Sequence, residues 1–206
     1  MSNLDHFQIG GLDITTKVIN KSNIVELDQG LRDLLATARK DGVNLTIGLD
    51  IEKRYQNIPN NLRPSKEYVS ALMFCCGDFC LIIQLYHLTA LEFCSVSKFL
   101  QLQELTFVGV RIKHCLEALG TSWGIKCRYA VDLRNFAATT FTQSNILGTY
   151  KLIDLAVLVS NHVFDKDELF TKCNGAALSD WSFGTLSRHQ IEAATWRAYL
   201  YFNTSI

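Results

Sequence analysis

The stretch VNLTIGLDIEKRY, residues 43–55, decides how the rest of the chain is interpreted. Its first part is apolar enough to be a sheet strand, which we expect over residues 43–51. Asp50 and Glu52 stand at the end of that strand. Side chains two residues apart on a strand project to the same face, about 7 Å apart. Such a carboxylate pair suits a divalent cation, Mg²⁺ or Mn²⁺, and it is also found as a solvent-facing acidic pair.

Towards the N-terminus, residues 13–19 alternate apolar and polar side chains and predict a half-exposed strand. Asn23 followed by Glu26 forms a capping box that predicts the start of a helix. Asp41-Gly42 ends that helix. On the other side of the acidic strand, residues 56–67 hold both prolines of the chain and predict a long exposed loop.

Two apolar segments follow, residues 68–76 and 79–86, with Gly77-Asp78 between them. That dipeptide suits a tight hairpin turn, so the sheet is expected to start with three antiparallel strands. After these strands, the sequence pattern alternates between helix and strand. We expect a helix at 95–102, a strand at 105–110, a helix at 112–119 and a strand at 127–133, and then helices at 145–159 and 187–202. The prediction is one α/β domain over residues 1–206, a mixed sheet covered by helices.

The composition of the chain excludes several classes of protein. The 206 residues carry 20 basic and 20 acidic side chains and 48% hydrophobic residues. A chain of this length can bury roughly 70% of its unfolded surface without disulfides or a structural metal. Zero net charge excludes a generally basic nucleic-acid binder and leaves room only for a local site. No apolar run approaches the ~20 residues of a membrane span, and no secretory signal precedes the domain, so we expect a cytoplasmic protein.

The seven cysteines are odd in number and most of them lie among apolar neighbours. We therefore expect reduced core thiols. They form no Cys-x-x-Cys pair, and no paired histidine spacing accompanies them, so a zinc site is not expected.

Taken together, three segments resemble the motifs of the DnaQ-like, ribonuclease H-fold 3′-to-5′ exonucleases, in the branch of the Werner-type exonucleases and ribonuclease D. IGLDIE resembles the first motif, FVGVRIKHCLEAL at 107–119 the second, and LSRHQIEAATWRAYLYF, preceded by SDW at 179–181, the third. The resemblance covers about residues 10–204. It implies a hydrolase that uses two metal ions held by four carboxylates to activate a water molecule.

The chain departs from the family at three positions of that site. Cys115 stands where the second motif has an aspartate, and Ala193 and Arg197 stand where the third has a tyrosine and an aspartate. Only Asp50 and Glu52 carry over as catalytic and metal-binding residues. Arg197 would bring a cation to the place where the family binds metal. A lone subunit is therefore expected to bind metals poorly.

Two hypotheses follow. One is a catalytically inert protein that keeps the fold and RNA binding. The other, which we weight more heavily on resemblance, is an active site completed by a neighbouring subunit. A plant group of small proteins, the RISC-interacting clearing 3′-to-5′ exoribonucleases, is similar over essentially the whole length. That resemblance implies a homohexameric ring, Mg²⁺ or Mn²⁺, and clearance of uridylated single-stranded RNA left by Argonaute proteins, in support of microRNA accumulation and gene silencing.

Basic and aromatic residues follow the acidic strand. Lys53, Arg54 and Tyr55 are predicted to contact RNA phosphates and bases, although a solvated loop explains them equally well. Asp132, Asp154 and Asp78 are the candidates for a replacement carboxylate, and the sequence does not choose among them.

Three further side chains lie in or near the motifs. His114 and His189 are candidate general bases, with surface or capping roles the commoner outcome. Cys115 is a poor candidate nucleophile because no activating base is evident.

Overall fold

A computed structural model describes residues 4–40, 45–56, 66–140, 150–159, 164–176, 179–182 and 184–205. Within these ranges the chain forms one seven-stranded mixed sheet with the order β1-β2-β5-β4-β3-β6-β7. β1 pairs with β2, β5 with β4 and β4 with β3 in antiparallel fashion, whereas β2–β5, β3–β6 and β6–β7 are parallel. The strands are β1 Leu4–Ile9, β2 Leu12–Ile19, β3 Thr46–Gln56, β4 Lys66–Cys76, β5 Phe79–Gln84, β6 Thr106–Gly109 and β7 Ala130–Asp132.

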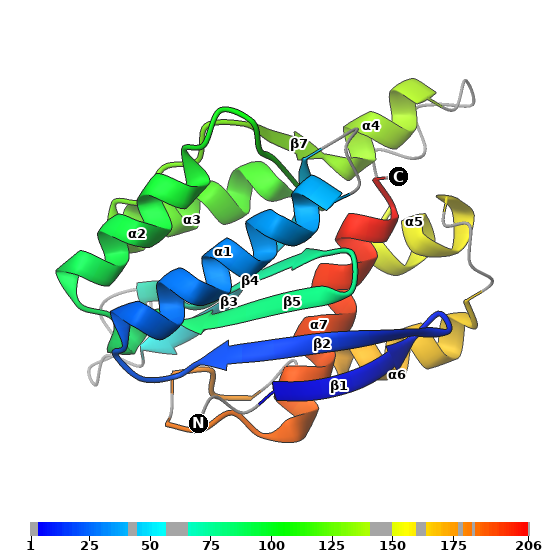
Figure 1. Ribbon diagram of the computed structural model, residues 1–206. Coiled ribbons are helices and arrows are strands. Elements are labelled where there is room, and N and C mark those ends of the chain that lie inside the picture. The colour runs from blue at the N-terminus through cyan, green and yellow to red at the C-terminus, as the bar shows by residue number, and fades with distance from the viewer. Residues whose placement is uncertain are drawn as a thin grey trace.

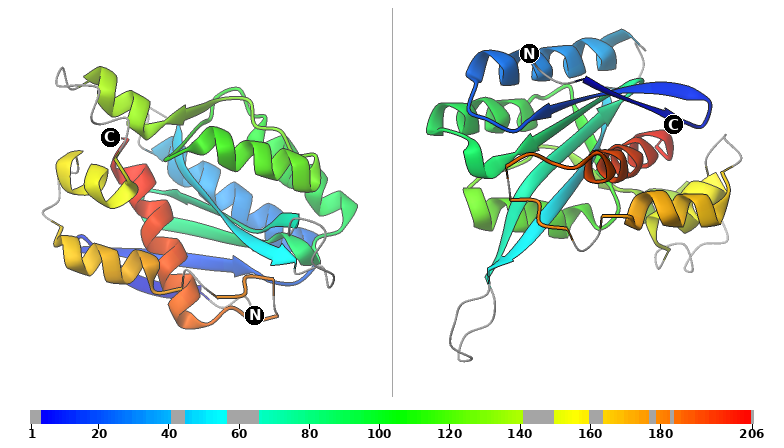
Figure 2. Two further views of the ribbon diagram at one scale, coloured as in Figure 1. Left: turned by 180° about the vertical axis from the view of Figure 1, so that it is seen from behind. Right: turned by 90° about the horizontal axis from the view of Figure 1, so that it is seen from below.

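Helices cover both faces of this sheet (Figure 1). One apolar cluster joins one face of the central strands to α1, α2 and α3, and a second joins the other face to α4, α5, α6 and α7. The view from behind shows α7 crossing the sheet directly (Figure 2). The helices are α1 Ile24–Lys40, α2 Ala90–Leu100, α3 Ile112–Trp123, α4 Leu133–Thr140, α5 Leu152–Val159, α6 Lys166–Asn174 and α7 Arg188–Asn203, and the 3-10 turn η1 spans Leu85–His87.

This architecture confirms the predicted mixed sheet flanked by helices, the ribonuclease H-like fold. The hairpin turn at Gly77 is also present. The predicted capping box is half formed: the Asn23 side chain accepts a hydrogen bond from the Glu26 amide, but the Glu26 carboxylate accepts from the side-chain amide of Asn23 and not from its backbone N–H. None of the described helices combines the length and the apolar character needed to cross a membrane.

Several predicted boundaries were wrong. β1 was not predicted. A turn in which Gly10 and Gly11 both adopt positive φ joins it to β2. β3 continues past residue 51 to Gln56 because its outer half pairs with the start of β4, and both ends of the loop predicted at 56–67 therefore belong to strands. The helices α4 and α6 were not predicted either. Part of the predicted loop, at 57–65, and of the predicted helix, at 145–149, lies outside the described residues.

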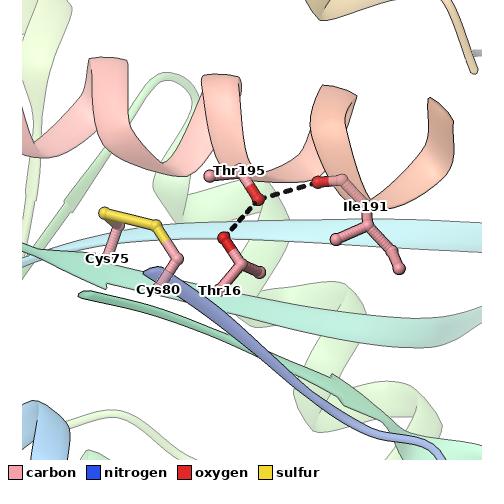
Figure 3. The surroundings of a disulfide bond; sticks show 5 residues. All are labelled: Thr16, Cys75, Cys80, Ile191 and Thr195. Carbon is pink, nitrogen blue, oxygen red and sulfur yellow. Dashed lines mark hydrogen bonds between the residues drawn. A yellow bond between two sulfur atoms is a disulfide. The ribbon is translucent and has the colours of Figure 1, made fainter. Parts of the chain in front are cut away.

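The prediction that all seven cysteines are reduced was wrong for two of them. Cys75 and Cys80 are direct partners across the β4–β5 hairpin, with Cα atoms 4.2 Å apart, and form a disulfide. Figure 3 shows this disulfide lying under α7, near a buried hydrogen bond of 2.9 Å between the hydroxyls of Thr16 and Thr195. The other five cysteines are not part of a disulfide between described residues.

One glycine lets α7 lie close to the sheet. A Cβ atom on Gly48 of β3 would stand 2.3 Å from the carbonyl oxygen of Ala198 and 2.7 Å from the backbone nitrogen of Phe202. Both atoms are backbone, so no side-chain rotation can relieve the clash. Gly48 lies two residues before Asp50, and Ala198 directly follows Arg197. The contact therefore sets the distance between the acidic strand and α7.

We predict that Gly48→Ala lowers the unfolding free energy of the protein by about 1–3 kcal/mol, the usual cost of overpacking a core. Gly120→Ala is the matched control. Gly120 lies within α3, its Cβ would meet only the backbone carbonyl of Ile125, at 3.5 Å, and alanine favours a helix interior. Urea denaturation of both variants measures the difference. Equal unfolding free energies for the two would contradict the close-contact argument.

Candidate functional site

Asp50 and Glu52 lie on the face of β3 that α7 covers. Across the β3–β4 ladder their partners are Met73 and Ala71, which belong to the apolar cluster that includes α7. The alternation of the strand therefore turns both carboxylates towards the helix, as the sequence predicted. Their side chains are 10% and 17% exposed, so both are largely withdrawn from water.

Arg197 of α7 lies between these two carboxylates. Its Nε donates a hydrogen bond of 2.7 Å to Oδ2 of Asp50, and its Nη2 donates to Oε1 of Glu52. Nη1 donates to the backbone carbonyl of Cys173 at 3.0 Å. Trp181 adds an aromatic face, with its ring centre 5.9 Å from the guanidinium carbon. The guanidinium is thus fixed by three acceptors from β3 and α6 and is only 13% exposed.

The charges of this cluster do not cancel completely, because two carboxylates face one guanidinium. Burial raises the pKa of Glu52 to about 7, and repulsion from Asp50 adds to the rise while Arg197 opposes it. Burial alone would lower the pKa of Arg197, but the two carboxylates raise it above its ordinary value. The cluster therefore holds one permanent cation and takes up a proton on Glu52 near neutral pH.

The remaining family positions add no ligand to this pair. Burial raises the pKa of the Cys115 thiol to about 12, and the charge of Asp50 adds to the rise. A thiol in this state is a poor metal ligand and a poor nucleophile. Ala193 is buried in the core. Among the described residues, no group of three or more His, Cys, Asp or Glu side chains is placed to hold a metal ion. The donor set of the single chain does not fit the two metals that the resemblance implies.

The candidate replacement carboxylates are engaged elsewhere. Asp132, at the end of β7, accepts hydrogen bonds from Nε and Nη2 of Arg134 at 3.0 and 2.9 Å. Asp154 of α5 pairs with Lys166 at 2.8 Å. Asp78 is exposed in the β4–β5 turn, where its backbone carbonyl accepts a hydrogen bond from Thr15. These three candidates are not brought to the Asp50–Glu52 pair.

Basic residues follow the two carboxylates along β3. Nζ of Lys53 is 3.2 Å from Nε2 of His114, so strand β3 and helix α3 present two nitrogen groups together. Arg54 is exposed one residue further on. Tyr55 belongs to β3, but its side chain lies outside the described structure. His189 is exposed near the start of α7.

Sequence reasoning missed two contributors to the site. Trp181 was noted only as part of the third motif, yet its indole covers the Arg197 guanidinium. Tyr201 belongs to the same motif. It is buried one helical turn after Arg197, and burial together with the charge of Asp50 raises its pKa well above the ordinary value. The helical spacing of four residues between Arg197 and Tyr201 was the available signal.

These features define the chain as a protein with the DnaQ-like, ribonuclease H-like exonuclease fold. Escherichia coli RNase D, an exoribonuclease involved in structured RNA processing, is similar with a TM-score of 0.64 and 15% identity over 89% of this chain and 41% of its own. The exonuclease domain of Aedes aegypti Nibbler is similar with a TM-score of 0.66 and 13% identity over 91% and 84%. Trypanosoma brucei RNase D in complex with RNA U12 is similar with a TM-score of 0.63 and 18% identity, over 92% of this chain and 61% of its own.

The chain thus spans less than two thirds of either RNase D. No protein-family model matches the sequence, and no curated protein matches it. The likeness at these identities is one of fold.

We predict that the unfolding free energy contributed by Glu52 falls as pH rises. Folding raises the pKa of Glu52 from 4.5 to about 7, so the folded state binds this proton more tightly than the unfolded chain. Stability from this group is complete below about pH 4.5 and is lost through pH 7, a change of about 3 kcal/mol. Glu52→Gln removes this pH-dependent contribution. In urea denaturation, the unfolding free energy of Glu52→Gln relative to wild type should therefore be higher at pH 8 than at pH 5.

The exposed Glu117 provides the control, because Glu117→Gln changes the same chemical group on the outer face of α3. An equal stability difference between Glu52→Gln and wild type at both pH values would show that Glu52 does not titrate as described.

Proposed function

We propose that this protein binds single-stranded RNA on the exonuclease fold and does not hydrolyse it as a single chain. The observation that carries the proposal is the Arg197 guanidinium, which hydrogen-bonds both Asp50 and Glu52. Hydrolysis by the family's route needs metal ions on these carboxylates. A divalent cation at that position would have to displace a buried guanidinium and leave it without its acceptors, which is costly.

RNA binding is supported by the basic groups beside the carboxylates and by the fold. Lys53, His114 and Arg54 offer nitrogen groups to phosphate oxygens at the edge of the cluster. T. brucei RNase D, which shares the fold, has been solved with RNA U12. Because only a few cations contribute, we expect a salt-sensitive affinity of limited strength.

The absence of metal binding is directly testable by isothermal titration with MnCl₂. We predict no saturable heat for the wild type and saturable binding for the double variant Cys115→Asp/Arg197→Asp, which places four carboxylates at the family positions. Adding Asp50→Asn to the double variant should weaken that binding, because one ligand is lost. Saturable Mn²⁺ binding by the wild type that disappears in Asp50→Asn would contradict the proposal.

Retention of RNA is tested with a labelled, 3′-tailed single-stranded RNA in the presence of Mg²⁺ or Mn²⁺. The wild type should retain the RNA at low salt, release it as salt rises, and leave its length unchanged with or without a chelator. Lys53→Ala/Arg54→Ala should weaken retention, since two phosphate contacts are removed. Shortening of the RNA by wild type, and its loss in Asp50→Ala, would overturn the inert function.

A second candidate function is a metal-dependent 3′-to-5′ exoribonuclease whose site is completed at subunit interfaces. It is favoured by the retained Asp50 and Glu52 and by a fold shared with E. coli RNase D, an exoribonuclease. Under this proposal, residues 1–206 form one cytoplasmic domain that assembles into a homohexameric ring. Asp50 and Glu52 bind Mg²⁺ or Mn²⁺, Lys53, Arg54 and Tyr55 contact RNA, and the enzyme clears uridylated fragments left by Argonaute proteins.

Light scattering separates the two candidates. A monomer has no neighbour to supply carboxylates and favours the inert function. An oligomer that shortens RNA, and that loses activity out of proportion when Asp50→Ala subunits are mixed in, favours the shared site.

A further inference from the structure

An aromatic pocket lies next to the carboxylate cluster, at the end of the sheet where β4 starts and β5 ends. Its volume is about 340 Å³, and we call it the aromatic pocket. Its lining combines three aromatic side chains, one guanidinium, two serines and a single aliphatic side chain: Tyr68, Tyr86, Trp123, Arg54, Ser70, Ser182 and Val69. A cavity of this size falls within the range of small-molecule sites.

The inner wall of the aromatic pocket is held rigidly. Nε1 of Trp123 donates a hydrogen bond of 2.7 Å to the carbonyl of Val69, and the Val69 amide donates to Oγ of Ser122 at 3.1 Å. The indole also stacks on Phe93 of α2, with ring centres 4.9 Å apart and an interplanar angle of 25°. The orientation of Trp123 is therefore fixed before any ligand enters.

The outer wall is accessible to a ligand. Tyr86 of η1 is 66% exposed, and Arg54 is exposed directly opposite Tyr68 in the β3–β4 ladder. The amide and the hydroxyl of Ser182 both donate to Asp180, at 2.9 and 2.6 Å, which fixes the loop on this side. The lining thus combines a fixed ring, that of Trp123, with an exposed ring and an exposed cation.

The aromatic pocket adjoins the acidic cluster along two segments of chain. Arg54 follows Glu52 by two residues on β3, a step of about 7 Å along a strand. Ser182 directly follows Trp181, whose ring covers Arg197. Lys53, which contacts His114, directly precedes Arg54 on β3, so a phosphate at this pair would lie one residue along the strand from the pocket lining.

We infer that the aromatic pocket binds one base of single-stranded RNA by stacking, with Arg54 beside it for the adjacent phosphate. The inference rests on the proposed RNA binding and names the part of the protein that recognises a base. Stacking on aromatic rings suits any base, because every base has a π-face. Arg54 adds a cation that an uncharged aromatic ligand would not use.

The test uses the 206-residue chain, a labelled oligouridylate and two small probes, uridine 5′-monophosphate and ribose 5-phosphate. Tyr86→Ala should weaken oligouridylate binding roughly 5- to 150-fold in fluorescence anisotropy, because one stacking ring is lost. Phe170→Ala is the matched control, since Phe170 is 62% exposed on α6 and does not line the pocket. In ¹H–¹⁵N spectra, uridine 5′-monophosphate should shift the Trp123 indole resonance, and ribose 5-phosphate should leave it unchanged.

The outcomes separate this inference from the proposed function. If Tyr86→Ala binds oligouridylate as tightly as wild type does, and uridine 5′-monophosphate leaves the Trp123 signal unmoved, the base pocket is overturned and RNA binding stays in place. Wild type that shifts Trp123 with uridine 5′-monophosphate but retains no oligouridylate would support the base pocket and overturn the proposed function. Equal shifts from both probes would show that the sugar phosphate is recognised without the base, which also overturns the inference.

Discussion

The hydrogen bonds from Arg197 to Asp50 and Glu52 are the interaction on which the interpretation of this site depends. They join the central strand β3 to α7, the helix that crosses one face of the sheet. Breaking a buried ion pair by removing one partner usually costs roughly 3–5 kcal/mol, because a charge is left without compensation. The same bonds occupy both carboxylates that the exonuclease fold would use for metal. The bonds that hold α7 to β3 are thus the same bonds that occupy the two carboxylates.

This interaction requires a close approach of helix and strand. Gly48 has no side chain, and the backbone at Ala198 and Phe202 fills the space that a Cβ would need. With α7 at this distance, the guanidinium reaches two residues of one strand face as well as the carbonyl of Cys173 on α6. A second copy that completed the site would have to bring carboxylates to a position where Arg197 is already bonded three times.

The sequence predicted the fold and the acidic pair well because both depend on local pattern. Asp50 and Glu52 share a strand face by alternation alone, and the Gly77 turn and the Asn23 cap are set by a few neighbouring residues. The effect of Arg197 was also foreseen from its place in the third motif. Its hydrogen bond to the Cys173 carbonyl and its contact with Trp181 were not foreseen, since they join segments that only the tertiary fold brings together.

The Cys75–Cys80 disulfide was missed because its geometry depends on strand register, which composition does not reveal. The aromatic pocket was missed for a similar reason. Tyr68, Tyr86 and Trp123 come from three separate elements and meet only at the end of the sheet. The paired states of Asp132 and Asp154 likewise depend on where Arg134 and Lys166 fall in space.

The most direct test of the central claim is a crystal structure of the wild-type protein soaked in MnCl₂, with anomalous diffraction recorded for manganese. The account predicts an Arg197 guanidinium bonded to Asp50 and Glu52 and no anomalous peak between these carboxylates. A manganese peak coordinated by Asp50 and Glu52, with Arg197 displaced from them, would contradict it.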